Sequence, residues 1–200
     1  MCMYEIDFNR PGKELFAIET DRLRLAVLRK NSAQAVTDYL VRNKEFHQKW
    51  SQTHNDSYFL LKTQKKYLSY DETEYKAGRL VPLWIMKKDE PDRIIGRVSF
   101  FNIAYGGMMS CAVGYHLDEG CTGKGYMREA LLAASCLMAK ELKMHRIEAF
   151  ILPENERSLN LIRKAGFTEE GLRKSYMHIN GQWRDHMSFY ILDETLRKIF

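Results

Sequence analysis

Hydrophobic residues recur along this chain at spacings of two in some segments and of three to four in others. The spacing of two predicts about seven strands, over residues 20–28, 80–88, 93–103, 108–117, 145–152, 168–179 and 183–192. The first alternates leucine and valine with charged residues, so one of its faces is expected to be wet. Asn180-Gly181 lies between the last two and predicts a two-residue hairpin turn.

Spacings of three and four predict about four helices. They cover residues 31–43, about 57–77, 123–144 and 154–167, with Gly166 closing the last one. Antiparallel strands joined by crossover helices form an α+β domain, here with a mixed, mostly antiparallel sheet. No linker-like change of composition divides the chain, so residues 1–200 are expected to form one domain.

The run TGKGYM at 122–127 comes directly before the clearest predicted helix. N–H groups in the first turn of a helix lack an intrahelical acceptor and attract anions, and glycine lets the backbone approach a ligand. A Walker A loop is excluded because Gly125, not Ser or Thr, follows Lys124. A dinucleotide fingerprint is excluded because Arg128 occupies its third glycine position. A pyrophosphate-binding helix start and a plain strand–helix turn both remain open.

The composition of the chain limits the partners and the cellular compartment that are expected for the protein. The chain has 31 Lys and Arg against 26 Asp and Glu, a net charge of +5, which is no strong signal for nucleic acid. No apolar run approaches the roughly 20 residues of a membrane span, and residues 1–16 lack the apolar core of a secretory signal. A cytoplasmic protein is therefore expected. No metal-binding spacing is present among the four cysteines, Cys2, Cys111, Cys121 and Cys136. Cys111 and Cys136 are expected to be core thiols, and Cys121 an incidental loop residue.

Two stretches resemble the GNAT superfamily of acetyl-CoA-dependent N-acetyltransferases. They are VGYHLDEGCTGKGYMREAL and, further on, HRIEAFILPENERSLNLIRKAGF. TGKGYM stands where that family has its Q/R-x-x-G-x-G/A loop. The segments ETDRLRL and EGLRKSYMHINGQWRDH resemble the RimJ/RimL branch. The resemblance is strong over 92–190 and weaker over 1–91.

The resemblance implies acetyl-CoA as the cofactor. Its pyrophosphate would be held by the loop amides of Thr122, Gly123, Lys124, Gly125, Tyr126 and Met127. Thr122 and Met127 depart from the family pattern, which contacts through the backbone should tolerate. The strand Val113 to Leu117 would be separated from its neighbour by a bulge. Pantetheine would then bind backbone groups near His116 and Leu117, and one of those amides is a candidate oxyanion donor.

The resemblance assigns the catalytic roles less completely than the cofactor contacts. Asn155 is implied as a pantetheine or water contact, and it is also a good helix N-cap. Ser158 matches a serine suspected of protonating the leaving thiolate, although a solvent-facing serine is the simpler interpretation. The tyrosine acid and glutamate base of relatives are replaced here by Ile162 and Met177. Glu148 is then the first candidate base and Tyr176 the second. Weaker candidates are His116, His178, His186 and Asp185.

The aromatic N-terminal half is expected to shape the substrate site, although most of its rings should simply pack helices on the sheet. These rings are Trp50, Tyr58, Phe59, Tyr67 and Trp84. Tyr105, in a glycine-containing loop, is a candidate for the acceptor channel.

Three functions are compatible with the sequence. The first is direct acetyl transfer, through a ternary complex, to the N-terminal amine of a protein. The expected acceptor is a ribosomal protein whose N-terminal residue is alanine, and the enzyme would be a monomer or a homodimer. The second is acetylation of a small amine such as an aminoglycoside or a polyamine, which an acidic acceptor pocket would favour. The third is a ribosome-associated binding module without catalysis.

Overall fold

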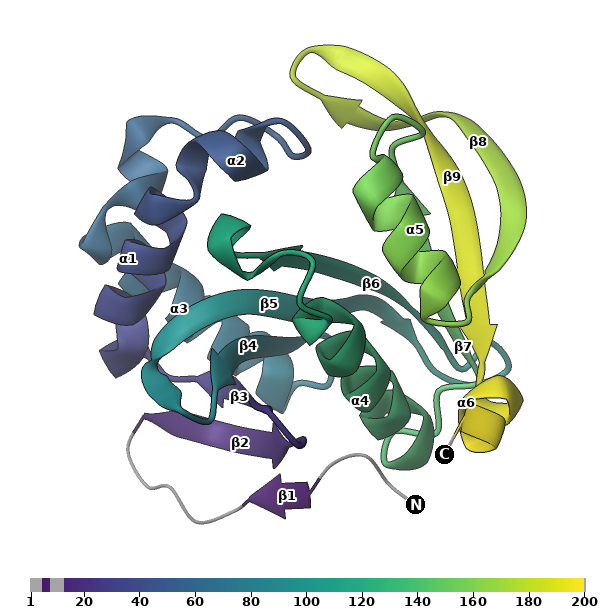
Figure 1. Ribbon diagram of the computed structural model, residues 1–200, viewed down its shortest axis with the longest axis horizontal. Helices are drawn as coiled ribbons and strands as arrows, with labels where there is room; N and C mark the ends of the chain where they lie inside the picture. The colour runs from purple at the N-terminus through teal and green to yellow at the C-terminus, as the bar shows by residue number, and fades with distance from the viewer. Residues whose placement is uncertain (1–4, 8–12, 200) are drawn as a thin grey trace.

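The computed structural model describes residues 5–7 and 13–199, and in this part of the chain all strands join one nine-stranded sheet (Figure 1). The sheet order is β1-β2-β3-β4-β5-β6-β7-β9-β8. The strands are Glu5–Asp7 (β1), Glu14–Glu19 (β2), Leu23–Leu28 (β3), Val81–Lys87 (β4), Glu90–Ala104 (β5), Ser110–Leu117 (β6), Arg146–Ile151 (β7), Thr168–Ile179 (β8) and Gln182–Leu192 (β9). Every neighbouring pair is antiparallel except β6 and β7.

Six α-helices are present among the described residues. They are Ala33–Arg42 (α1), Lys44–Gln48 (α2), Leu61–Lys76 (α3), Tyr126–Lys140 (α4), Glu156–Lys164 (α5) and Asp193–Ile199 (α6). The predicted α+β class with a mostly antiparallel sheet is confirmed, while the predicted counts of about seven strands and four helices are too low. The extra elements, β1, β2, α2 and α6, are between three and seven residues long. Such short segments carry too few positions for periodicity to identify them.

Two hydrophobic clusters cover the two faces of the sheet. One joins α4 and α5 to Leu25, Ile85, Val98 and their neighbours on the strands. The other joins α1 and α3 to alternate strand positions such as Ala26 and Trp84. In Figure 1, α4 and α5 accordingly lie on the near side of the sheet and α1 and α3 at its other side.

The prediction that one face of the first predicted strand is exposed to water is wrong. All six residues of β3 are buried, including Arg24, which is 2% exposed. Its guanidinium is satisfied by two carboxylates of β2, Glu14 and, at 2.7 Å, Glu19. A buried charge is tolerated when it is paired in this way. The unpredicted strand β2 thus converts an edge position into an interior one.

Several local predictions are confirmed. Asn180 and Gly181 both have positive φ, 51° and 83°, as a two-residue hairpin turn requires. Gly166 ends α5 with a φ of 85°. Cys111 and Cys136 are buried thiols, and Cys121, in the short 3-10 turn before Thr122, is buried as well, whereas Cys2 lies outside the described residues. None of the described helices is long and apolar enough to cross a membrane.

The sheet opens between β6 and β7. These strands pair only through Ser110 to Ala112 on β6, opposite Arg146 to Glu148 on β7. Beyond that point Val113 to Leu117 have no partner on β7. The separation predicted for this segment is therefore confirmed, but its cause is a divergence of the two strands, because their described pairing contains no register shift.

Candidate functional site

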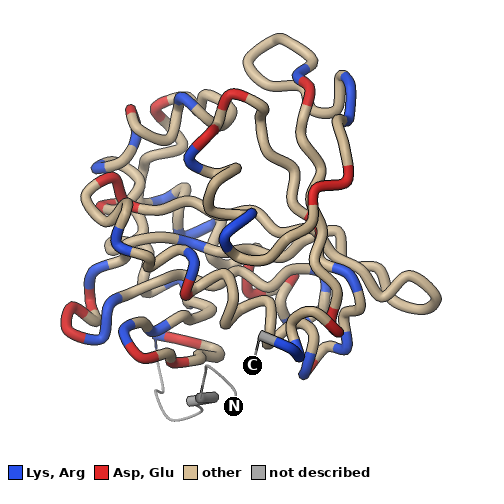
Figure 2. Tube along the Cα trace, turned by 45° about the vertical axis from the view of Figure 1, so that its right-hand side comes forward, with Lys and Arg blue, Asp and Glu red and all other residues tan. Residues whose placement is uncertain are grey.

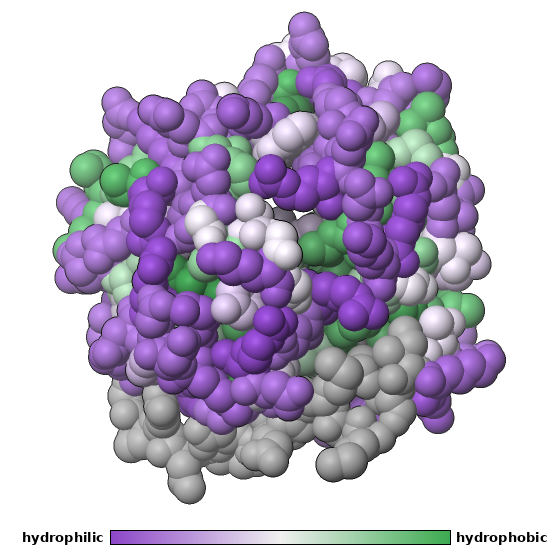
Figure 3. Space-filling model, in the orientation of Figure 1, coloured by the Kyte–Doolittle hydropathy of each residue, from purple (hydrophilic) through white to green (hydrophobic). Residues whose placement is uncertain are grey.

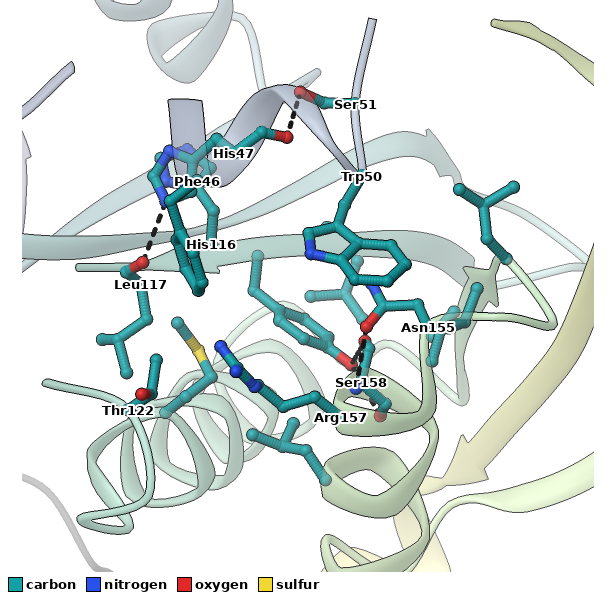
Figure 4. A pocket seen from close by; sticks show the side chains of 18 of the residues that line it. Phe46, His47, Trp50, Ser51, His116, Leu117, Thr122, Asn155, Arg157 and Ser158 are labelled. Atoms are coloured by element: carbon teal, nitrogen blue, oxygen red, sulfur yellow. Dashed lines mark hydrogen bonds between the residues drawn. The ribbon is translucent and has the colours of Figure 1, made fainter. Parts of the chain in front are cut away.

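A cavity of about 670 Å³ occupies the opening between the diverging strands. Its walls come from β6, the end of β7, the starts of α4 and α5, and the segment around α2. Figure 3 shows the molecule hollowed near the middle of this face. Figure 4 shows side chains from α2 and from α5 directed into the hollow from opposite sides.

The loop before α4 presents backbone donors to this cavity. Gly123 and Gly125 have φ values of 76° and 80°, in the left-handed region that favours glycine. The first helical bond is donated by Glu129 to Gly125, so the N–H groups of Tyr126, Met127 and Arg128 have no helical acceptor. A Cβ on Gly123 would meet no atom within 4 Å, so the space beside this glycine is open. These features fit an anion that approaches the backbone N–H groups closely, with no side chain of Gly123 or Gly125 between them.

The start of α5 carries a hydroxyl pair. Asn155 is the N-cap, since its Oδ1 accepts the N–H of Ser158 at 3.2 Å, and it also lines the cavity. The hydroxyl of Ser158 lies 2.7 Å from that of Tyr115 on β6. Burial raises the pKa of Tyr115 to about 12, so the phenol keeps its proton at neutral pH. The pair therefore places an O–H donor at the edge of the gap (Figure 4).

The end of β6 is held by residues of the N-terminal half. The Nε2 atom of His47 lies 2.8 Å from the carbonyl oxygen of Leu117, so this nitrogen carries the proton. His116 turns its Nδ1 to the hydroxyl of Tyr39 at 2.6 Å. Burial, with the neighbouring His47 and Arg97, lowers the pKa of His116 well below its usual value. Burial also lowers the pKa of His47, although its bond to Leu117 acts in the opposite direction. Both rings are therefore neutral at pH 7.

Comparison with known proteins agrees with this geometry. An acetyltransferase (GNAT) domain model matches residues 22–168. The [ribosomal protein uS5]-alanine N-acetyltransferase of Escherichia coli is 34% identical over 170 residues, which are 85% of this chain and 87% of that protein.

The chain belongs to the GNAT acetyltransferase family.

Solved structures support the same assignment. The ribosomal-protein-S5-alanine acetyltransferase of Vibrio fischeri superposes with a TM-score of 0.83 at 29% identity, covering 89% of this chain and 97% of that one. The RimJ protein of Mycobacterium smegmatis, solved in complex with CoA-disulfide, gives 0.81 at 26% identity and covers 88% and 87% of the two chains.

The cofactor of this family is acetyl-CoA, which supplies an activated acetyl thioester when bound. The acetyltransferase cavity fits such a molecule, because unpaired helix-start donors lie at one end and an unpaired strand edge lies beside them. Most of the predicted cofactor contacts line the cavity, namely His116, Leu117, Thr122, Gly123, Gly125, Tyr126, Met127, Asn155 and Ser158. Lys124 does not, because its ammonium group donates to Gly120 O at 2.8 Å within its own loop.

Neither predicted base reaches the cavity lining. Glu148 lies on β7 one residue before the first lining residue of that strand, Ala149, and pairs with Arg146 at 3.1 Å and Arg173 at 3.5 Å. Tyr176 packs on Phe150 and lies behind His186. Phe150, which shares its strand face with Glu148, does line the cavity, so Glu148 lies outside the lining because of its position along the strand.

The weaker base candidates divide into two groups. His116 and His186 line the cavity, and His186 is 3% exposed with its Nδ1 donating to Arg184 O at 3.1 Å. His178 instead packs on Trp183, and Asp185 pairs with Lys174 at 2.7 Å.

The predicted aromatic contribution is partly correct. Trp50, Tyr58 and Phe59 line the cavity, Trp84 is buried in the sheet core, and Tyr67 is exposed. Tyr105 is exposed and donates to Gly78 O at 3.1 Å, away from the cavity lining. Among the described residues, the 102–109 loop therefore contributes none to the lining of this cavity.

Sequence reasoning missed several lining residues. Tyr115 stands between Gly114 and His116 in the quoted stretch VGYHL, and its place on the same strand face as Val113 and Leu117 could have identified it. Phe46 and His47 belong to the short helix α2, and Arg157 crosses from α5 to lie 5.1 Å from the Phe46 ring (Figure 4). No motif marks these residues, because their proximity arises only from folding.

The charge of the cavity wall is one-sided. Among the described residues that line it, four are basic, Lys44, Arg128, Arg157 and Lys164, and none is Asp or Glu. Elsewhere the two signs are interspersed along the chain (Figure 2). Lys44 is neutralised by Asp56 at 2.7 Å, which leaves a net positive wall.

Proposed function

We propose that this acetyltransferase transfers the acetyl group of acetyl-CoA to the N-terminal α-amino group of a protein, with an alanine-starting ribosomal protein as the acceptor class. The lack of any carboxylate among the described lining residues carries the choice of acceptor. Polyamines and aminoglycosides are polycations, and they would meet a net positive wall. A peptide N-terminus brings a single amine that can attack in its neutral form.

The relatives support the same acceptor class. The Escherichia coli and Vibrio fischeri proteins are both named as acetyltransferases of a ribosomal protein's alanine. The first covers most of both chains at 34% identity.

The residues divide the work as follows. The N–H groups at the start of α4 hold the pyrophosphate, and the unpaired edge of β6 aligns the pantetheine arm. Ser158, held by Tyr115, is the proton donor to the leaving sulfur. An α-amino group has a pKa near 8, so a weak base suffices to deprotonate it. His47, whose pKa is lowered by burial, lines the cavity and is our candidate to take that proton, and His186 lines the cavity as a second candidate.

The test is a comparison of acceptors with the purified protein and acetyl-CoA. Mass spectrometry should show N-terminal acetylation of an alanine-starting peptide, at a kcat/KM at least about 10-fold above that for spermidine. Preferred turnover of spermidine would contradict the proposed acceptor class. No turnover of any amine, together with no binding of CoA by calorimetry, would overturn the transferase function itself.

A further inference from the structure

Arg22, in the turn between β2 and β3, reaches the back of the loop that precedes α4. Its Nη1 donates to the carbonyl oxygen of Lys124 at 3.1 Å. Its guanidinium also lies 4.6 Å from the centroid of the Tyr126 ring. Arg22 is not among the residues that line the cavity, so it contacts the loop from the side away from the cavity.

Glu129, in the first turn of α4, fixes the position of Arg22. Its carboxylate accepts from Arg22 Nε at 2.7 Å and from the Arg22 backbone N–H at 3.1 Å. The Thr20 hydroxyl donates to the same carboxylate at 2.6 Å. The Glu129 side chain is 12% exposed and that of Arg22 49%, so the carboxylate is shielded from water while part of the guanidinium is not.

This contact determines where a loop amide points. In a trans peptide the C=O and the following N–H are directed oppositely, so turning Lys124 C=O toward Arg22 turns Gly125 N–H the other way. Gly125 lines the cavity, whereas Arg22 does not. A Cβ at Gly125 would come within 3.4 Å of Arg22 Nη2, so glycine at this position also makes room for the guanidinium.

We propose that Arg22, held by Glu129, is a positioning residue for the pyrophosphate loop: it draws the Lys124 carbonyl away from the cavity and thereby directs the Gly125 amide at the diphosphate of CoA. The proposal rests on the proposed function, because it assumes that CoA is the ligand. It assigns a role to Thr20-Asp21-Arg22, the turn between β2 and β3, which lies about one hundred residues before the loop in the sequence.

The test separates the diphosphate from the rest of the donor. Arg22→Gln should weaken CoA binding, measured by calorimetry, about 10-fold, the loss expected of one charge-assisted hydrogen bond. The kcat/KM with acetyl-pantetheine, which lacks the diphosphate, should stay within about two-fold of the unmodified protein. Arg22→Lys keeps the charge but lacks the fork, so it should lose CoA affinity as well.

Two further variants complete the experiment. Glu129→Gln weakens the same arrangement without changing Arg22 and should shift CoA affinity in the same direction. Arg79→Gln removes a surface arginine that pairs with Glu74 at 2.7 Å. It should leave both the CoA affinity and the kcat/KM with acetyl-pantetheine unchanged.

The outcomes distinguish the two proposals. Unchanged CoA affinity in both Arg22 variants, or an equal loss with acetyl-pantetheine, would overturn the positioning role while leaving acetyl transfer intact. Retained affinity in Arg22→Lys alone would reduce Arg22 to a source of charge, which also overturns it. Lack of CoA binding by the unmodified protein would instead count against the proposed function.

Discussion

The hydroxyl pair of Ser158 and Tyr115 joins two elements that bound the gap. Ser158 belongs to α5 and Tyr115 to β6, and only 2.7 Å separates their oxygens. Because the phenol stays protonated, it orients the serine hydroxyl without competing for a proton at neutral pH. A donor fixed in this way costs little reorganisation when charge develops on the leaving sulfur.

Replacing Ser158 by alanine should lower kcat roughly 10- to 100-fold, the range for loss of one general acid, with a smaller change in CoA affinity. Tyr115→Phe should reduce kcat less, and the double variant should be no worse than Ser158→Ala, because both act through one hydroxyl. Steady-state kinetics and calorimetry measure the two effects. Ser135→Ala is the matched control, since that buried hydroxyl in α4 has no hydrogen-bond partner among the described residues. Normal turnover by Ser158→Ala would remove the serine from the mechanism.

At the scale of elements, the cavity is spanned by contacts between two segments far apart in the chain. The N–H of Thr53, after α2, donates to Oδ1 of Asn180 at the tip of the β8–β9 hairpin at 2.7 Å. Arg157 on α5 lies over Phe46 of α2. In Figure 1 the α2 segment and the hairpin accordingly approach each other above the sheet. An extended chain end can pass beneath such a span, whereas a folded surface cannot.

Asn180→Gly should loosen this span and leave the hairpin turn intact, because glycine accepts the positive φ of 51° at this position. The KM for a peptide acceptor should rise about three-fold or more, the effect of losing one hydrogen bond, while CoA affinity stays unchanged. Lys174→Ala in the same hairpin breaks the pair with Asp185 but not the span, and serves as the control. An unaltered peptide KM in Asn180→Gly would show that the contact does not shape the acceptor path.

The elements themselves were predictable where a pattern was long. The helix after TGKGYM and the Asn180-Gly181 hairpin follow from local sequence, because many positions or one demanding turn specify each of them. The helix α2 did not, since five residues cannot show a period. The buried Arg24 was misread for another reason: its partners Glu14 and Glu19 belong to a strand whose own pattern is weak.

On the scale of the whole molecule, the site depends on contacts that no local pattern contains. The resemblance to the family indicated the loop before α4, Asn155 and Ser158, and the cavity lining includes residues of all three. It could not locate the Tyr39 hydroxyl beside His116, or Arg22 behind Lys124, because 77 and 102 residues separate these partners. The two candidate bases lie outside the lining for a similar reason, since the pattern along one strand does not show where its neighbour diverges from it.

Global stability should depend on pH through the neutral histidines of this region. The pKa of His116 is depressed in the folded protein, so below its ordinary value of about 6.5 the unfolded chain binds the extra proton first. The contribution is therefore complete above about pH 6.5 and declines as pH falls, by about 1.4 kcal/mol per pH unit for one proton. His47 and His54, whose pKa values are also lowered, act in the same direction.

Chemical denaturation between pH 5 and pH 8 checks this dependence. His116→Gln should show a shallower loss of unfolding free energy below pH 6.5 than the unmodified protein. His145→Gln alters an exposed histidine that contacts Asp193 and should preserve the original slope. Equal slopes for His116→Gln and the unmodified protein would mean that His116 does not govern this dependence.

The brief parallel pairing of β6 with β7 has a consequence for how such a protein can diversify. The gap begins where the two backbones diverge after Ala112 and Glu148, and it does not arise from a register shift. Residues 44–60, several of which line the cavity, can therefore be exchanged without altering the pairing that opens the sheet. The substrate specificity can thus change through substitutions at the rim of the cavity, while the sheet that forms the cavity stays the same.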